Sequence, residues 1–225
     1  MRAVVVEDQI LFQELLVDLL TRRLGIELAG VAGDGPAALE LVRKTRPDLV
    51  VLDILIPQLS GIQVARTILE ELPATRILAV STETDPKTVH QIHLLNLAGF
   101  IDKNEATTAV LTEALHEIRE GRRYFSASML AVVRQLRAHP QSFPKILSPR
   151  EQEILSHIGG GLSDSQIGRL LGLTENSVQS HRRNLLRKLD LHSTPELMRY
   201  ALEAGFWKPA FPRLQLEDPY PRERA

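Results

Sequence analysis

The sequence predicts an α/β fold, a doubly wound five-stranded parallel sheet, followed by a separate all-α domain of four helices. Two observations indicate this. In residues 1–120, short runs rich in Val, Ile and Leu alternate with stretches whose apolar residues recur at helical spacing. In residues 147–207 only helical patterns occur, and capping residues precede them. A chain of 225 residues is long enough for two such domains.

The predicted strands are short and continuously apolar, as strands buried on both faces of a parallel sheet are. We expect them at residues 4–6, 26–31, 49–52, 77–80 and 99–101. Apolar stripes predict the helices between them: Leu11, Leu15, Leu16, Leu19 and Leu20, then Ala38, Leu41 and Val42, then Ile62, Ala65, Ile68 and Leu69, and lastly Val110, Leu111, Ala114, Leu115 and Ile118. Asp85 with Pro86 is typical of a helix start between the fourth and fifth strands.

Capping sequences mark the helices of the second domain. Ser148-Pro149-Arg150-Glu151 combines an N-cap, a first-turn proline and a capping-box glutamate, and further starts follow at Ser163, Thr174 and Ser193. Between the domains, residues 121–146 are polar with two prolines and a short helical patch, so they are predicted to form a partly helical linker. Residues 208–225 are rich in proline and predicted to be an irregular tail.

Composition narrows the function classes. The chain has no cysteine, which excludes disulfides and cysteine-based metal sites. It shows no signal peptide and no apolar run of about 18 residues, so we expect a cytoplasmic protein without a membrane partner. Residues 1–120 hold 11 Lys/Arg and 18 Asp/Glu, whereas residues 121–205 hold 12 and 7. The basic second half favours a polyanionic partner, although chance variation between two surfaces would also produce such a difference.

Polar side chains follow the predicted strands. Glu7 and Asp8 come after the first, Asp53 ends the third, Ser81 ends the fourth, and Lys103 follows the fifth. The carboxyl ends of parallel strands meet at one edge, where sites form. Crowded carboxylates suit Mg²⁺, and an Asp beside it can accept a phosphoryl group, whose charge a lysine and a hydroxyl offset. Isolated acidic residues in solvated loops are common, but the joint pattern favours a functional site.

Four stretches resemble a response-regulator receiver domain across residues 1–120: Val5-Val6-Glu7-Asp8, Asp53-Ile54-Leu55-Ile56-Pro57 with Gly61, Val80-Ser81, and Gly99-Phe100-Ile101-Asp102-Lys103. The resemblance implies a flavodoxin-like fold and a phospho-acceptor, Asp53, served by a partner sensor histidine kinase. It implies that Mg²⁺ is held by Glu7, Asp8, Asp53 and the backbone carbonyl of Leu55. It also implies that Ser81 and Lys103 contact the phosphate.

Phe100 takes the position of the aromatic residue that changes rotamer in such receivers, although an aromatic residue in a strand is often only part of the core. Three features depart from, or vary within, the family pattern. Glu7 is more often Asp, and Asp102 stands where an apolar residue is usual. Leu55 and Glu83 occupy the positions that tune phosphate lifetime in this family.

A helix expected from about Thr174 to Leu189 has two different faces. Its inward face carries apolar residues and its outward face polar ones. The inward residues are Val178, Leu185 and Leu189; the outward residues are Gln179, Ser180, Arg183 and Arg187, with Arg182 and Lys188 on the flanks. Such a helix fits the DNA major groove, where Gln and Arg read base edges and Arg and Lys hold phosphates. A solvated basic face is the alternative.

Three further stretches resemble a LuxR-type helix-turn-helix DNA-binding domain: 147–151 with Ile154-Leu155, Gly161-Leu162-Ser163 with Gln166-Ile167, and Asn176-Ser177-Val178 with His181 and Lys188-Leu189. The domain order resembles the NarL/FixJ subfamily. This implies transcription regulation by a homodimer bound to double-stranded DNA, acting on the transcription machinery. It places base contacts at Gln179, Ser180 and Arg183, and phosphate contacts at Arg182, Arg187 and Lys188. Dimer contacts are placed at Met198, Ala201 and Leu202, for which core packing is the alternative.

Two other functions remain open. An aspartyl-phosphate hydrolase carries a second Asp two positions after its nucleophile, but here that position is Leu55. A receiver that is never phosphorylated would act only as a protein-interaction surface, which the intact set of acidic residues argues against. We therefore expect no enzyme, apart from assistance with its own phosphorylation and dephosphorylation. Gly168 replaces the usual alanine of the supporting helix, which predicts a slight weakening of that helix.

Overall fold

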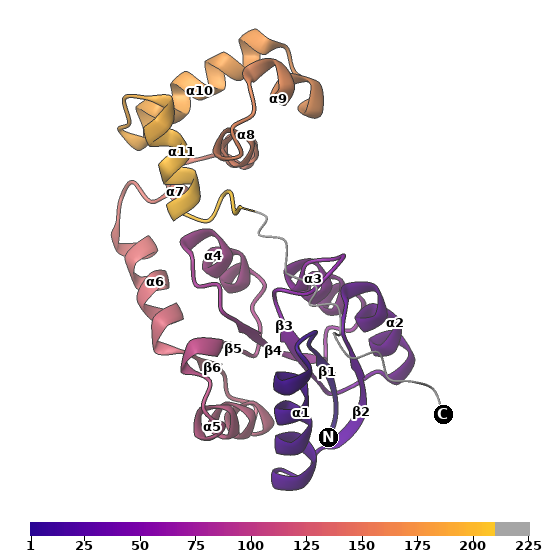
Figure 1. Cartoon of the computed structure of the whole chain (residues 1–225). Coiled ribbons are helices and arrows are strands. Elements are labelled where there is room, and N and C mark those ends of the chain that lie inside the picture. The colour runs from indigo at the N-terminus through magenta and orange to yellow at the C-terminus, as the bar shows by residue number, and fades with distance from the viewer. Residues whose placement is uncertain (210–225) are drawn as a thin grey trace, which may run out of the picture. The chain divides into compact units, whose positions relative to one another are not determined.

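The computed structural model describes residues 1–209, so nearly all of the predicted tail, 208–225, lies outside the described residues. The chain divides into two compact units, of which the first is Met1–Ile146 and the second begins at Leu147 (Figure 1). Within residues 1–209, none of the helices combines the length and the apolar character that a membrane span requires.

The first unit contains a parallel sheet in the order β2-β1-β3-β4-β5-β6 (Figure 1). Its five long strands confirm the predicted sheet: β1 (Arg2–Val6), β2 (Glu27–Ala32), β3 (Leu49–Asp53), β4 (Arg76–Ser81) and β5 (Gly99–Asp102). Because β2 and β3 pair with opposite edges of β1, the chain reverses its direction of winding there. In sheets of this order, a crevice forms at the carboxyl ends of β1 and β3.

Helices cover both faces of this sheet. Alternate strand residues separate two apolar clusters, since Val4 faces one cluster and Val5 the other. One layer contains α2 (Gly35–Thr45), α3 (Gly61–Glu71) and α4 (Pro86–Leu94), and the opposite layer contains α1 (Ile10–Asp18), its continuation as a π-helical turn at Leu19–Arg23, and α5 (Thr108–Arg119).

One member of the predicted apolar stripes lies outside the core. Leu11 is 83% exposed, whereas Leu16, Leu19 and Leu20 are buried. Leu11 precedes Leu16 by five residues, which is about 140° around a helix, so it points away from the sheet.

The segment predicted as a linker is part of the first unit. Residues Tyr124–Phe125 form β6, which pairs in parallel with β5, and the backbone N–H of Ser126 donates to the carbonyl of Phe100 at 2.9 Å. Helix α6 (Ala127–Ala138) follows and packs on the α4 layer, where its Met129 and Val133 join the apolar cluster that contains Phe100. A short helix, α7 (Phe143–Ile146), ends the unit.

The described part of the second unit, residues 147–209, is a small helical domain with four helices, as predicted. They are α8 (Pro149–Gly159), α9 (Asp164–Leu171), α10 (Glu175–Leu189) and α11 (Thr194–Glu203). Ser148 and Ser163 form capping boxes with the residues three positions later, as the sequence pattern indicated. Gly172 ends α9 in the left-handed conformation, which allows the sharp turn into α10.

Candidate functional site

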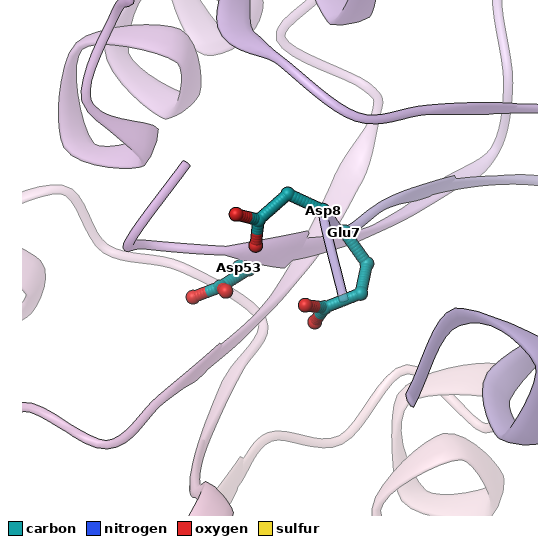
Figure 2. A group of neighbouring side chains, drawn as sticks. All are labelled: Glu7, Asp8 and Asp53. Atoms are coloured by element: carbon teal, nitrogen blue, oxygen red, sulfur yellow. The ribbon is translucent and has the colours of Figure 1, made fainter. Parts of the chain in front are cut away.

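The acidic residues that follow β1 and β3 lie together. Ligand oxygens of Glu7, Asp8 and Asp53 all lie within 4.8 Å of one another (Figure 2). Glu7 and Asp53 are buried, and Asp8 is half-buried. The sheet order causes this grouping, because β1 and β3 are neighbours and both end at the crevice.

Lys103, at the end of β5, reaches the same cluster. Its Nζ lies 2.7 Å from Oε2 of Glu7 and 2.9 Å from Oδ2 of Asp53. The other oxygen of Asp53, Oδ1, accepts the backbone N–H of Leu55 at 2.8 Å. The carboxylate of Asp53 is therefore held by fixed donors on both oxygens.

The ammonium group of Lys103 also lies 4.6 Å from the centre of the Phe12 ring. This cation–π contact was not predicted, because Phe12 belongs to none of the motifs and only its place in the first turn of α1 brings it near the strand ends. A ring over one side of the ammonium group limits how far Lys103 can turn away from the two carboxylates.

Glu7 has an altered acidity. Burial raises the pKa of its carboxyl group above the ordinary value, although the hydrogen bond from Lys103 lowers it, and the nearby charge of Asp53 adds to the increase. Oε1 of Glu7 accepts the backbone N–H of Gln9 at 3.0 Å. Glu7 is thus a buried acid between a lysine and a second carboxylate, and one methylene longer than the Asp that is usual at this position.

The donor set fits a divalent cation of the hard type. Three carboxylates share one lysine, so negative charge exceeds positive charge in a crevice that is largely shielded from water. Carboxylate oxygens are hard donors and suit Mg²⁺, which usually keeps several of its own waters. The residues that would hold it are Glu7, Asp8 and Asp53.

A glycine keeps the backbone close beneath this site. At Gly61 a Cβ atom would lie 2.3 Å from the carbonyl oxygen of Asp53 and 2.6 Å from Cα of Ile54. The N–H of Gly61 donates to the carbonyl of Ile54 at 3.0 Å. Only glycine allows α3 to begin this close to the loop that carries Asp53.

The remaining predicted residues of the first unit, Ser81, Phe100 and Asp102, lie on β4 and β5, the strands beside the acidic cluster. Ser81 is buried at the end of β4, and its Oγ accepts the N–H of Glu83 at 3.0 Å. Phe100 is fully buried in the apolar cluster that α4 and α6 share. Asp102 caps the short 3₁₀ turn at Lys103–Glu105 by accepting from Asn104, which gives this unusual residue a local structural role.

The outer face of α10 presents the side chains predicted to contact DNA. Ser180, Arg183 and Arg187 are exposed, Gln179 is half-buried, and Val178 and Leu185 are buried inward. Within residues 1–209, the two arginines donate to neutral neighbours on the same helix, Arg183 to Ser180 and Arg187 to Asn184, both at 3.1 Å, and neither forms an ion pair. Their positive charges are therefore available to a polyanion.

Two residues predicted to contact phosphate also form ion pairs inside the unit. Nζ of Lys188 lies 2.8 Å from Oε2 of the buried Glu151, which also accepts from the N–H and hydroxyl of Ser148. Arg182 donates to Asp164, at the start of α9, at 2.5 Å. Neither carboxylate partner could be predicted from the sequence, because they lie 37 and 18 residues from their cations.

The three predicted dimer residues on α11 differ in exposure. Leu202 is 47% exposed and Met198 half-buried, but Ala201 is fully buried. A Cβ at Gly159 would lie 2.8 Å from that of Ala201, so Ala201 packs against α8. For Ala201 the structure favours the alternative of core packing.

Comparison with known proteins agrees with both units. The family described as response regulator receiver domain matches residues 3–116, and the luxR family of bacterial regulatory proteins matches residues 145–201. The transcriptional regulatory protein MctR of Rhizobium johnstonii is 34% identical over 180 residues, which cover 80% of this chain and 83% of MctR. The chain belongs to the NarL/FixJ subfamily of response regulators.

Other relatives support this membership. The probable transcriptional regulatory protein NarL of Mycobacterium tuberculosis is 33% identical over 190 residues, covering 84% of this response regulator and 87% of NarL. A solved structure of RcsB from Salmonella enterica serovar Typhimurium, bound to a promoter in the presence of phosphomimetic BeF₃⁻, has a TM-score of 0.65 at 18% identity and covers 91% of this chain and 98% of RcsB. At that identity the likeness shows the fold alone. The chain is thus a transcriptional regulator with a receiver domain and a LuxR-type DNA-binding domain.

Proposed function

We propose that Asp53 accepts a phosphoryl group from a partner sensor histidine kinase and that this controls DNA binding by the second unit. The observation that carries the proposal is the buried carboxylate of Asp53, held 2.9 Å from Lys103 and grouped with Glu7 and Asp8. A carboxylate in such a site can attack phosphorus without the chain having to reorganise first.

In the proposed step, one carboxylate oxygen of Asp53 forms a bond to phosphorus, and the bond from phosphorus to the donor breaks. The product is an acyl phosphate, and the leaving group departs with the electron pair. Lys103 offsets part of the added negative charge, and the hydroxyl of Ser81 can turn from its present partner to donate to a phosphate oxygen. When bound, Mg²⁺ would supply the rest of the neutralising charge, held by Glu7, Asp8, Asp53 and the carbonyl of Leu55.

We further propose that a homodimer binds double-stranded DNA through Gln179, Ser180, Arg183 and Arg187, in the cytoplasm, and acts on the transcription machinery. The exposed arginines of α10 and their lack of a carboxylate partner among the described residues support this. Several solved RcsB structures are complexes with DNA, and one is described as two RcsB dimers bound to two parallel DNAs.

Labelling with radioactive acetyl phosphate in the presence of Mg²⁺ tests the phospho-acceptor. Wild type should incorporate label, and Asp53→Asn should not. Asp18→Asn is the matched control, because Asp18 is a half-buried residue at the end of α1 that pairs with the exposed Arg22, and this variant should label like wild type. Equal labelling of wild type and Asp53→Asn refutes the assignment. Release of phosphate from an external phosphate ester would favour the hydrolase alternative instead.

A further inference from the structure

A groove of about 140 Å³ lies between α4 and the α6–α7 segment, away from the acidic site. Helices α4 and α6 lie side by side (Figure 1), and all the lining residues belong to the first unit. Val133, Leu136 and Pro144 supply apolar surface. His90 and His93 from α4, with Arg137 and Lys145 from the opposite wall, complete the lining.

The groove is positively charged without a counter-charge. Residues 121–146 contain five Lys/Arg and no Asp/Glu, and among the described residues no carboxylate lines the groove. Lys145 donates to the backbone carbonyls of Arg137 and His139, and Arg137 contacts Nε2 of His93 at 2.9 Å. Within residues 1–209, neither cation forms an ion pair. An anion placed there would therefore gain two cationic partners at once.

Size and shape restrict what can enter. A cavity of about 150 Å³ holds one benzene ring in a protein interior, so this groove accepts a single ring or a short branched chain. His90 contacts the ring of Phe143 edge-to-face at 5.5 Å, which fixes one wall. Burial, with the nearby His93, lowers the pKa of His90, which disfavours a positive charge on His90. Arg137 and Lys145 are the permanent cations of the lining.

We propose that this groove binds a small amphipathic carboxylate, either an aromatic acid or a short branched-chain acid. The apolar part lies on Val133, Leu136 and Pro144, and the carboxylate accepts hydrogen bonds from Arg137 and Lys145. Such a ligand bridges α4 to the α6–α7 segment.

Because the groove lies between α4 and α6, a ligand bound there would affect regulation. This consequence rests on the proposed function. Helix α4 begins five residues after Ser81, and α6 shares its apolar cluster with Phe100. A bound acid that bridges α4 and α6 would change the free energy of the structural rearrangement that accompanies phosphorylation of Asp53. The unphosphorylated chain already contains the groove, so binding can be measured without phosphorylating Asp53.

Benzoate is the probe, titrated into the full chain and followed by calorimetry and amide NMR shifts. We expect saturable binding with a dissociation constant of about 1 mM or lower, and binding at least about tenfold weaker for acetate, which lacks the ring, and for benzyl alcohol, which lacks the charge. Arg137→Gln should weaken benzoate binding about tenfold. Leu136→Phe, which fills the groove, should abolish it.

Arg66→Gln is the matched control, since Arg66 is an exposed arginine on α3 outside this groove and should leave binding unchanged. Circular dichroism melting verifies that each variant is folded. Absence of saturable binding, equal binding of benzyl alcohol, or full affinity in folded Arg137→Gln would each overturn the proposal. The labelling of Asp53 is measured separately, so failure of benzoate to bind leaves the proposed function standing.

Discussion

A basic side chain on a DNA-reading helix can contact DNA phosphate or hold helices together, and Lys188 differs from Arg187 in this respect. Its ammonium group is committed to the buried carboxylate of Glu151, whereas Arg187, its neighbour, is exposed. A cation that contacts DNA phosphate releases counterions on binding, so its loss changes the dependence of affinity on salt. A cation that only holds two helices together changes stability instead.

We therefore predict different results for Arg187→Gln and Lys188→Gln. Arg187→Gln should reduce the slope of log K against log salt by about 0.9 per protomer, with little effect on unfolding. Lys188→Gln should leave the slope unchanged and lower the free energy of unfolding by about 1 kcal/mol, because Glu151 loses a charged partner. Fluorescence anisotropy with a selected DNA fragment and urea unfolding measure the two effects. A reduced slope in Lys188→Gln would restore it as a phosphate contact.

Glu151 makes the stability of the second unit depend on pH. Burial raises the pKa of its carboxyl group, but the hydrogen bonds from Lys188 and Ser148 outweigh burial and set the pKa below its ordinary value of 4.5. A carboxylate with a lowered pKa stabilises the fold above its unfolded pKa, and this is lost as pH falls through the folded pKa.

We predict that the stability difference between wild type and Glu151→Gln is constant above about pH 5 and shrinks as the pH falls below the ordinary value. Urea unfolding followed from pH 7 to pH 3 measures it. In Lys188→Gln the pKa of Glu151 loses one cause of its decrease and lies closer to its ordinary value, so the stabilisation at pH 7 should be smaller and its loss should be complete at a higher pH. A difference that stays constant throughout this range would show that Glu151 does not titrate in this way.

The sequence predicted that Gly168 weakens its helix, so that alanine at this position would stabilise it. The packing around Gly168 indicates instead that alanine would be destabilising. A Cβ there would lie 2.7 Å from the carbonyl oxygen of Leu173, in the turn between α9 and α10. Alanine gains about 1 kcal/mol in helix propensity, whereas forcing backbone apart costs about 1–3 kcal/mol. Gly168→Ala should therefore destabilise the domain in thermal unfolding, while Leu170→Ala, at an exposed position on α9, should have little effect. A stabilised Gly168→Ala would contradict this.

At the scale of elements, the alternation of apolar runs predicted the five long strands. Four of them, β1, β3, β4 and β5, are buried almost throughout, whereas the edge strand β2 is mostly half-buried or exposed. The sixth strand could not be predicted, since β6 has two residues and no period can be recognised in so short a run. β6 forms because the edge of β5 is free to pair, and the residues around position 124 carry no information about that edge. Similarly, the acidic site followed from strand order, but the partners of Arg182 and Lys188 depend on how three helices pack.

Helix α6 should therefore contribute to the stability of the first unit. Met129→Ala removes a side chain that is fully buried in the cluster with Phe100 and should cost about 2–5 kcal/mol. Leu130→Ala is the matched control, because Leu130 is the next residue on the same helix and is exposed. Chemical unfolding of the full chain, followed by a probe in the first unit, measures both. Equal stabilities would mean that residues 121–146 act as a separate linker, as the sequence had suggested.

For the whole molecule, the basic excess that the sequence shows after residue 120 belongs mostly to the first unit, because the units divide at residue 147. The second unit and tail together hold 11 Lys/Arg and 10 Asp/Glu, because the basic excess lies mostly in residues 121–146. Net charge therefore does not bring the second unit to DNA. The local charges of α10 must do so, which makes binding sensitive to anything that restricts access to this helix.

Control by Asp53 should accordingly require both units. With BeF₃⁻ and Mg²⁺, the intact chain should change its affinity for a selected DNA fragment by about 5–150-fold, the range of typical coupling free energies. The fragment 147–225, a compact unit without Asp53, should bind DNA with no response to BeF₃⁻, as should intact Asp53→Asn. Measuring all three by fluorescence anisotropy separates coupling between units from a direct effect of the anion on DNA binding. A response in the isolated fragment would assign the effect to the anion, and none in the intact chain would favour a receiver that phosphorylation does not control.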